Sequence, residues 1–222
     1  TGVQTCALPI CTGIDVGFAG ATADAFGRLR ASEPFTLGDY KHIYAIDPSF
    51  INKLENGGTV TYNTNRASAT LATTSNSASR SVHQTKFYHH YQPGKSQMIM
   101  SSICFGYAQK NVTKRTGYFD DRDGIYFEQV GDNSANGTAN GTLNFVIRNY
   151  ISGTADETNN RIPQSQWNVD KFDGTGPSGM NIDISKVQLV WMYFQWLGVG
   201  KVRCRSEEHT SELQSRVDIS YA

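Results

Sequence analysis

The sequence has no hydrophobic run long enough to span a membrane and no excess of either charge. Its longest apolar run, LVWMYF at 189–194, is far shorter than the roughly 20 residues that a membrane-spanning helix needs. The chain holds 20 basic and 20 acidic residues, and setting aside 205–222, which hold two basic and four acidic ones, leaves 18 and 16 in residues 11–204. We predict no membrane partner, and no nucleic-acid partner, because nucleic-acid binders present a large basic face.

Cysteine is also scarce. Cys6 and Cys11 lie near the start of the chain, and Cys104 and Cys204 are 100 positions apart. This spacing matches neither a disulfide framework nor a zinc motif. We predict buried free thiols at Cys104 and Cys204, and no metal or other cofactor.

The two ends of the chain resemble translated sequencing-library adapter. RSEEHTSELQS at 205–215 and ISYA at 219–222 match such an adapter, and TGVQTCALPI at 1–10 matches it on the opposite strand. We therefore set residues 1–10 and 205–222 aside as not native and expect the natural protein to extend beyond both ends. The alternative is a genuine apolar leader and a genuine acidic tail.

Between these ends the chain is rich in Gly, Ser, Thr, Asn and Tyr, and its apolar residues alternate with polar ones. Residues 11–25 are small and Gly/Ala-rich and predict a linker or arm, and residues 26–204 predict one domain. The period of two is typical of half-buried strands. We predict an all-β fold, an antiparallel β-sandwich of jelly-roll or concanavalin-like type, truncated at both ends. The expected strands lie within 59–65, 67–75, 81–93, 96–109, 116–130, 142–152 and 186–203.

Two short segments give sharper local predictions. In 116–130, GYF and IYFEQV flank Asp120–Gly124, which predicts a hairpin, since an Asp-Gly step between aromatic runs is a hairpin signal. PSFINKLE at 48–55 predicts a helix of one or two turns, with Pro48 in the first turn and Asp47 as its cap.

Several short motifs suggest ligands but fail on spacing. Gly94-Lys95-Ser96 lacks the first glycine of a phosphate-binding loop, because position 89 is histidine, and a strand pattern follows it. FDDRDG at 119–124 lacks the EF-hand ligands, which leaves a hairpin turn or a looser calcium site. His89 and His90 point to opposite faces of a strand, so we expect surface or partly buried roles for them and for His83.

Acids and tryptophans suggest two further functions. Asp170, Asp173 and Asp183 flank a Gly-rich loop, where carboxylates serve glycoside hydrolysis or, more ordinarily, turns. We expect Trp191 to pack in the core, whereas Trp167, between polar residues, is the better candidate for an exposed sugar-binding aromatic. Trp196 is a third candidate for such a platform.

Five blocks in order carry a family resemblance. They are FGRLRASEPFTLGDYKH (26–42), FYHHYQPGKSQMIM (87–100), TGYFDDRDGIYFEQ (116–129), QSQWNVDKFDGTGPSG (164–179) and VQLVWMYFQWLGVGKVR (187–203). Together they resemble a family of phage-type virion structural proteins common in environmental viral sequences. The resemblance implies a mostly β particle component without enzymatic activity, and it supplies no functional residues.

The expected function is therefore assembly in a phage head, neck or tail. The partners would be other virion proteins and further copies of the chain, and the location the virion, or the host cytoplasm during assembly. One alternative is a carbohydrate-binding β-sandwich of a tail or receptor-binding protein, which would add glycans as partners. A polysaccharide hydrolase of the same fold class is the other alternative.

Overall fold

The computed structural model describes residues 35–93, 95–132, 139–157, 160–196, 200–208 and 215–221. Contacts divide the chain into two compact units, Ser32–Gln92 and a larger one that includes Pro93–Ala222. The predicted domain, 26–204, spans both units. Residues 1–10 and 11–25 lie outside the described residues.

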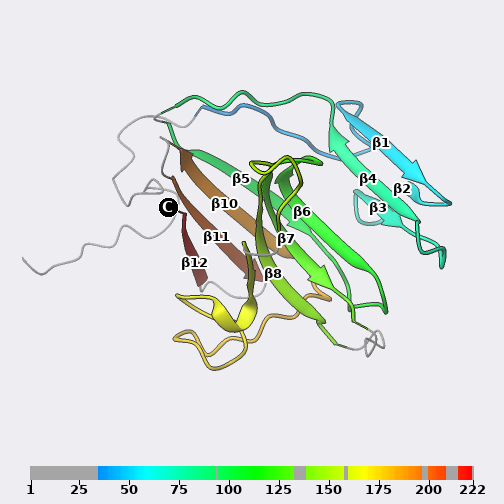
Figure 1. Ribbon diagram of the computed structural model, residues 1–222. Helices are drawn as coiled ribbons and strands as arrows, with labels where there is room; N and C mark the ends of the chain where they lie inside the picture. Colours follow the sequence, from blue (N-terminus) through cyan, green and yellow to red (C-terminus); the bar gives the residue numbers. More distant parts are fainter. Residues whose placement is uncertain are drawn as a thin grey trace, which may run out of the picture. The chain divides into compact units, whose positions relative to one another are not determined.

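All regular structure in the described residues is β-strand, apart from the short 3-10 turn η1 (Gln164–Gln166). The all-β prediction is confirmed, with every strand pairing antiparallel, and the choice between a jelly-roll and a concanavalin-like type stays a prediction. The strands are β1 (Phe50–Glu55), β2 (Thr59–Asn63), β3 (Ser68–Ala72), β4 (Arg80–Thr85), β5 (Gln97–Ile103), β6 (Thr113–Phe119), β7 (Gly124–Val130), β8 (Thr142–Arg148), β9 (Arg161–Pro163), β10 (Gln188–Trp196), β11 (Gly200–Glu208) and β12 (Ser215–Tyr221) (Figure 1).

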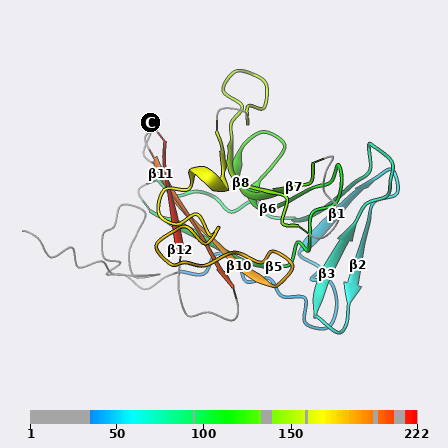
Figure 2. The same ribbon diagram turned by 90° about the horizontal axis from the view of Figure 1, so that it is seen from below.

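The larger unit is a sandwich of two four-stranded sheets. One sheet has the strand order β6-β7-β8-β9 and the other β12-β11-β10-β5. β10 lies at the centre of the second sheet, where Met192 pairs with Ile99 of β5 and with Cys204 of β11. The two sheets form separate layers (Figure 2).

The core lies between these sheets because successive side chains of a strand point to opposite faces. Ile125 and Phe127 of β7 alternate with Tyr126 and Glu128, which face the other side of the sheet. The core cluster also takes side chains from the facing sheet and from the loop after η1. Its members are Ile125, Phe127, Leu143, Phe145, Trp167, Phe172, Ile182, Ile184, Val190, Met192, Val202 and Cys204.

The smaller unit consists of two hairpin-like ribbons, β1-β4 and β2-β3. The helix predicted at 48–55 is wrong, because Phe50–Glu55 is a strand in full register with Arg80–Thr85. Eight residues offer few helical hydrogen bonds to offset nucleation, whereas pairing satisfies the backbone of the whole segment. The expected cap is a turn instead, with Ser49 N–H donating to Asp47 Oδ1 at 2.8 Å.

The predicted hairpin at 116–130 is confirmed as β6-β7, with Phe119 paired with Gly124 and Asp120 N–H bonded to the Asp123 carbonyl at 2.9 Å. The last expected strand segment, 186–203, forms β10 and the first four residues of β11. β11 continues to Glu208 and pairs with β12, so part of 205–222 is strand. The adapter origin of that segment stays a prediction.

Candidate functional site

The smaller unit exposes many large apolar side chains. Phe35, Tyr44, Phe87 and Tyr88 are 85%, 91%, 65% and 71% exposed. Isolated apolar residues are ordinary on a protein surface, whereas a contiguous group of them is typical of interaction surfaces.

The same unit has no apolar core among its described residues, 35–92, where Gly58 is the only buried residue. Ile51 and Leu54 of β1 are about half exposed, although they point to opposite faces of the ribbon. A two-stranded ribbon is marginally stable by itself. The unit therefore needs stabilising contacts beyond its own strands.

An imidazole–aromatic cluster supplies the main side-chain packing of this unit. Tyr40 Oη lies 3.0 Å from His89 Nε2, and His42 Nε2 lies 3.4 Å from His83 Nε2. Phe50 stacks on the His83 ring with centroids 4.3 Å apart and meets Tyr40 edge-on at 5.4 Å. These contacts hold the segment that contains Tyr40 and His42 against the β1-β4 ribbon.

The outer ring nitrogens of the central histidine pair also have partners. Asp47 N–H donates to His42 Nδ1 at 3.1 Å, and His83 Nδ1 lies 2.6 Å from Asn52 Oδ1, to which it donates. Burial, and secondly the neighbouring His42, lowers the pKa of His83, so this imidazole is neutral at pH 7.

His83 and His89 are partly buried and His90 is exposed, which are the roles predicted for them. The strand expected to hold His89 and His90 is wrong, however, because β4 ends at Thr85. The sequence did not single out His42. It lies 41 positions before His83, and no local spacing links the two residues.

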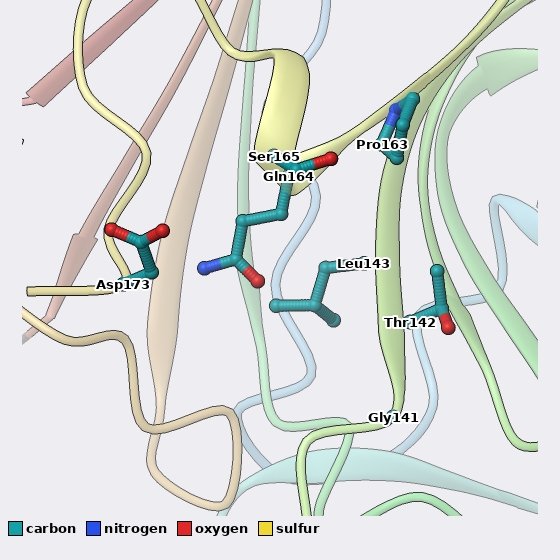
Figure 3. A pocket seen from close by; sticks show the side chains of 7 residues that line it. All are labelled: Gly141, Thr142, Leu143, Pro163, Gln164, Ser165 and Asp173. Carbon is teal, nitrogen blue, oxygen red and sulfur yellow. The ribbon is translucent and has the colours of Figure 1, made fainter. Parts of the chain in front are cut away.

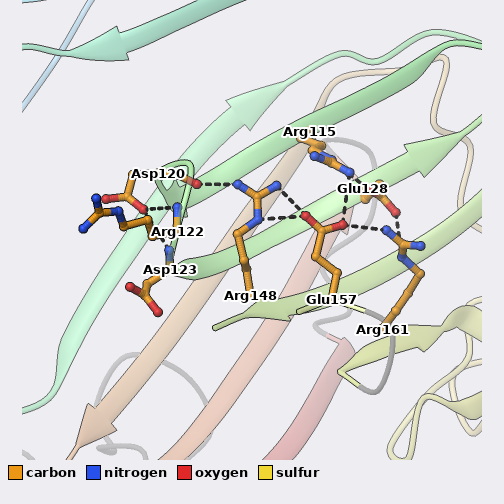
Figure 4. A network of polar contacts seen from close by, with 8 residues as sticks. All are labelled: Arg115, Asp120, Arg122, Asp123, Glu128, Arg148, Glu157 and Arg161. Atoms are coloured by element: carbon orange, nitrogen blue, oxygen red, sulfur yellow. Dashed lines mark hydrogen bonds and ion pairs between the residues drawn. The ribbon is translucent and has the colours of Figure 1, made fainter. Parts of the chain in front are cut away.

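A network of arginines and glutamates covers part of the outer face of the β6-β7-β8-β9 sheet (Figure 4). Glu128 is fully buried and accepts from Arg115 Nε at 2.8 Å, and it lies 3.2 Å from Arg161 Nε. Glu157 accepts from Arg148 Nε at 2.8 Å and from Arg161 at 3.0 Å, and it lies 3.4 Å from Arg115. Three guanidinium groups thus share two carboxylates.

The network shifts the pKa values of its members. Burial alone would raise the pKa of Glu157, but the hydrogen bond from Arg148 and the charge of Arg115 lower it below its ordinary value. Burial raises the pKa of Tyr126, whose ring lies 5.0 Å from the Arg115 guanidinium and 5.3 Å from that of Arg148. The arginine and glutamate side chains of the network thus form ion pairs with one another within the fold.

The carboxylates of the 119–124 turn shape the backbone. Asp120 Oδ1 accepts from the backbone N–H groups of Arg122 and Asp123 at 2.7 and 2.8 Å. Asp123 Oδ1 accepts from Tyr150 N–H at 3.1 Å. Asp120 thus has the ordinary turn-forming role expected in a hairpin, whereas Asp123 ties the turn to the segment after β8.

The three acids that flank the Gly-rich loop, Asp170, Asp173 and Asp183, also accept hydrogen bonds from backbone N–H groups. Asp170 is buried and accepts from Phe172 N–H at 2.9 Å and from Ser178 N–H at 2.8 Å. Asp173 and Asp183 each accept from the residue two positions on. Burial opposes but does not cancel the backbone bonds that lower the pKa of Asp170, so the carboxylate is ionised and holds the loop.

A shallow pocket of about 280 Å³ lies beside this loop (Figure 3). Thr142, Gln164, Ser165 and Asp173 give it polar groups, and Leu143 contributes an apolar side chain. Gln164 is fixed by a 3.0 Å bond from its Nε2 to the Phe172 carbonyl. The lining suits a small polar ligand with several hydroxyl groups.

The prediction that Trp167 is exposed is wrong. It is 2% exposed, packs 5.0 Å from the Phe145 ring and donates from Nε1 to the Ile162 carbonyl at 3.3 Å. Burial between the sheets releases more free energy than exposure of the indole beside polar neighbours. The prediction that Trp191 packs in the core is also wrong, because Trp191 lies between the core residues Val190 and Met192 and so faces the other side of β10, where it is partly buried. The side chain of Trp196 lies outside the described residues.

The remaining motifs are ordinary structure. β5 begins at Gln97, so Lys95 and Ser96 lead into a strand rather than a helix, and Gly94 lies outside the described residues. Cys204 is a buried free thiol as predicted, but Cys104 is exposed, with Sγ 3.2 Å from the Ser185 carbonyl, because it follows the end of β5.

The residues that the structure describes contain no group of three or more His, Cys, Asp or Glu side chains placed to hold a metal. Nor do they contain a helix with the length and apolar character needed to cross a membrane.

No family model matches this chain, and no curated protein and no solved structure matches it either.

Proposed function

We propose that this chain is a structural component of a phage virion, in the head, neck or tail, that acts through assembly contacts and not through catalysis. The five ordered sequence blocks suggest the family. The observation that carries the proposal is the smaller unit, which exposes Phe35, Tyr44, Phe87 and Tyr88 and buries no side chain among its described residues. A unit of this kind gains stability when a partner covers it.

The partners would be other virion proteins and further copies of the chain. Glu128, Glu157 and Asp170 bind groups within the fold. We expect apolar contact at the smaller unit to be the main source of binding free energy. The place of action would be the virion, and the host cytoplasm during assembly.

The proposal can be tested by sedimentation of the full chain over a hundredfold range of concentration. We expect self-association, and we expect the double change Tyr44→Ser and Tyr88→Ser to weaken it. Ile151→Ser is the matched control, because Ile151 is equally exposed, at 86%, but lies in the larger unit. A monomer at every concentration that also fails to bind neighbouring gene products of its source would count against the proposal.

A second candidate is a carbohydrate-binding module of a tail. The pocket beside Gln164 and Asp173 favours it, because amide and carboxylate groups pair with sugar hydroxyls. The burial of Trp167 removes the aromatic platform expected for it. A glycan array with the full chain tests this candidate, and Asp173→Ala should abolish any signal that comes from the pocket.

A further inference from the structure

The histidine pair of the smaller unit has the geometry of two ligands to one metal ion. The Nε2 atoms of His42 and His83 face each other at 3.4 Å. This separation is near the long limit for a hydrogen bond. Two Zn–N bonds of about 2.0–2.1 Å at a tetrahedral angle place the nitrogens about 3.3–3.4 Å apart. The observed distance therefore fits two ligands of one metal ion.

The surroundings of His83 support this geometry. A metal-binding histidine usually donates its other ring N–H to an oxygen, which fixes the tautomer and the ring orientation. His83 Nδ1 lies 2.6 Å from Asn52 Oδ1, directly across the β1-β4 register. The ring is also stacked on Phe50, with an interplanar angle of 5°. Its Nε2 is thereby held towards His42.

His42 needs one change to bind a metal. Its Nδ1 accepts from Asp47 N–H, so in the metal-free chain the proton sits on Nε2. When a metal takes Nε2, that proton moves to Nδ1, and the hydrogen bond from Asp47 is lost. No net proton is released, and the exchange gives up the hydrogen bonds of His42 with Asp47 and with His83 for two metal–nitrogen bonds.

The smaller unit also has neither a disulfide nor a core of its own to stabilise it. It has no cysteine in residues 32–92 and no buried side chain among its described residues. Units of about 60 residues with little core commonly depend on a disulfide, a metal or a partner. A metal at this pair would join the segment before β1 to strand β4.

We propose that His42 and His83 bind one divalent transition-metal ion of the zinc, copper or nickel class through their Nε2 atoms, with water at its remaining positions. Neutral imidazole is a preferred ligand for these three ions. The ion acts as a clamp for the smaller unit and takes no part in catalysis.

Calorimetric titration of the untagged full chain with Zn²⁺ tests the proposal. We expect one ion per chain with a Kd below about 100 µM, and a higher unfolding temperature when it is bound. His42→Gln and His83→Gln should each weaken binding at least tenfold. His90→Gln, which removes an exposed histidine of the same unit, should leave it unchanged. Equal weakening by all three variants, or no binding below that limit, would overturn the proposal.

If the variants fail to fold, a second measurement on the unchanged protein tests the metal site. Pulsed paramagnetic resonance of the unchanged protein with one equivalent of Cu²⁺ reports how many imidazoles bind the ion. Two coupled imidazoles are expected. Asn52→Ala keeps both ligands and should weaken Zn²⁺ binding about 10- to 100-fold, because it releases the His83 ring. A spectrum from one imidazole or none would reject the site.

Discussion

Replacement of Glu128 by glutamine should destabilise the sandwich more than any other single change in its charged network. The carboxylate is fully buried, whereas its partners Arg115 and Arg161 are 31% and 37% exposed at the side chain. Asn144 Nδ2 also donates to it at 3.2 Å. Glutamine keeps the shape but presents an NH₂ group to one of these donors.

The expected loss follows from this geometry. Removal of one partner of a fully buried ion pair costs about 3–5 kcal/mol. Here both arginines remain partly hydrated, which reduces the loss to about 2–3 kcal/mol. The unsatisfied amide of Asn144 adds about 1 kcal/mol. We expect Glu128→Gln to lower the free energy of unfolding by about 3 kcal/mol in total.

Urea unfolding followed by tryptophan fluorescence measures this loss, because Trp167 lies in the core of the same unit. Lys186→Gln, in the same unit, is the control. The ion pair of Lys186 with Asp183 is 3.8 Å long and the lysine side chain is 55% exposed, so its loss should cost under about 0.5 kcal/mol. If the two variants have equal midpoints and slopes, Glu128 does not hold the outer face of the sheet, and the reasoning is wrong.

Three further changes probe other parts of the sandwich. The pKa of Glu157 is lowered in the fold, so this carboxylate stabilises the protein at pH values above its ordinary pKa of 4.5, and the stabilisation is lost as the pH falls towards the folded-state pKa. Glu157→Gln should therefore make the unfolding midpoint less dependent on pH in that acid range. An unchanged pH profile would contradict this. Trp167→Ala should cost about 3–5 kcal/mol in the same urea assay, because it leaves a large cavity, and a loss below about 1 kcal/mol would show that the site collapses. Gly117→Ala should cost more than Gly174→Ala, because its new Cβ would lie 2.3 Å from the Ile125 carbonyl oxygen, whereas nothing lies within 4 Å at Gly174; thermal unfolding compares the two, and equal losses would mean that the strands shift to make room.

The β6-β7 hairpin shows which part of the charged network could be predicted from the sequence. Once the turn at Asp120–Gly124 is recognised, counting four residues back from Phe119 and four forward from Gly124 places Arg115 opposite Glu128. This half of the charged network was therefore within reach of the sequence. Glu157 was not, because it joins through the loop after β8, whose path no local pattern determines.

The wrong predictions at 48–55 and at Trp167 have a common cause, since in both cases tertiary contact outweighed a local signal. The helical signals at 48–55 gave way to pairing with a strand some 30 residues later. The polar neighbours of Trp167 indicated exposure, but the ring fills the space beside Phe145. The His42–His83 contact joins an irregular segment to a strand, so neither period nor spacing could reveal it.

The pairing of β5 with β10 sets the order in which the chain can fold. β6 to β9 follow one another and pair as sequential neighbours, so this sheet can form early, while the chain is still being made at the ribosome. β5 must wait for β10, about 90 residues later, before it gains its partner. During that delay Phe127 and Phe145 have no facing sheet, and the nascent chain is prone to aggregate. Slow translation after β9 should therefore lower the yield of folded protein, and a chaperone that shields this face should restore it.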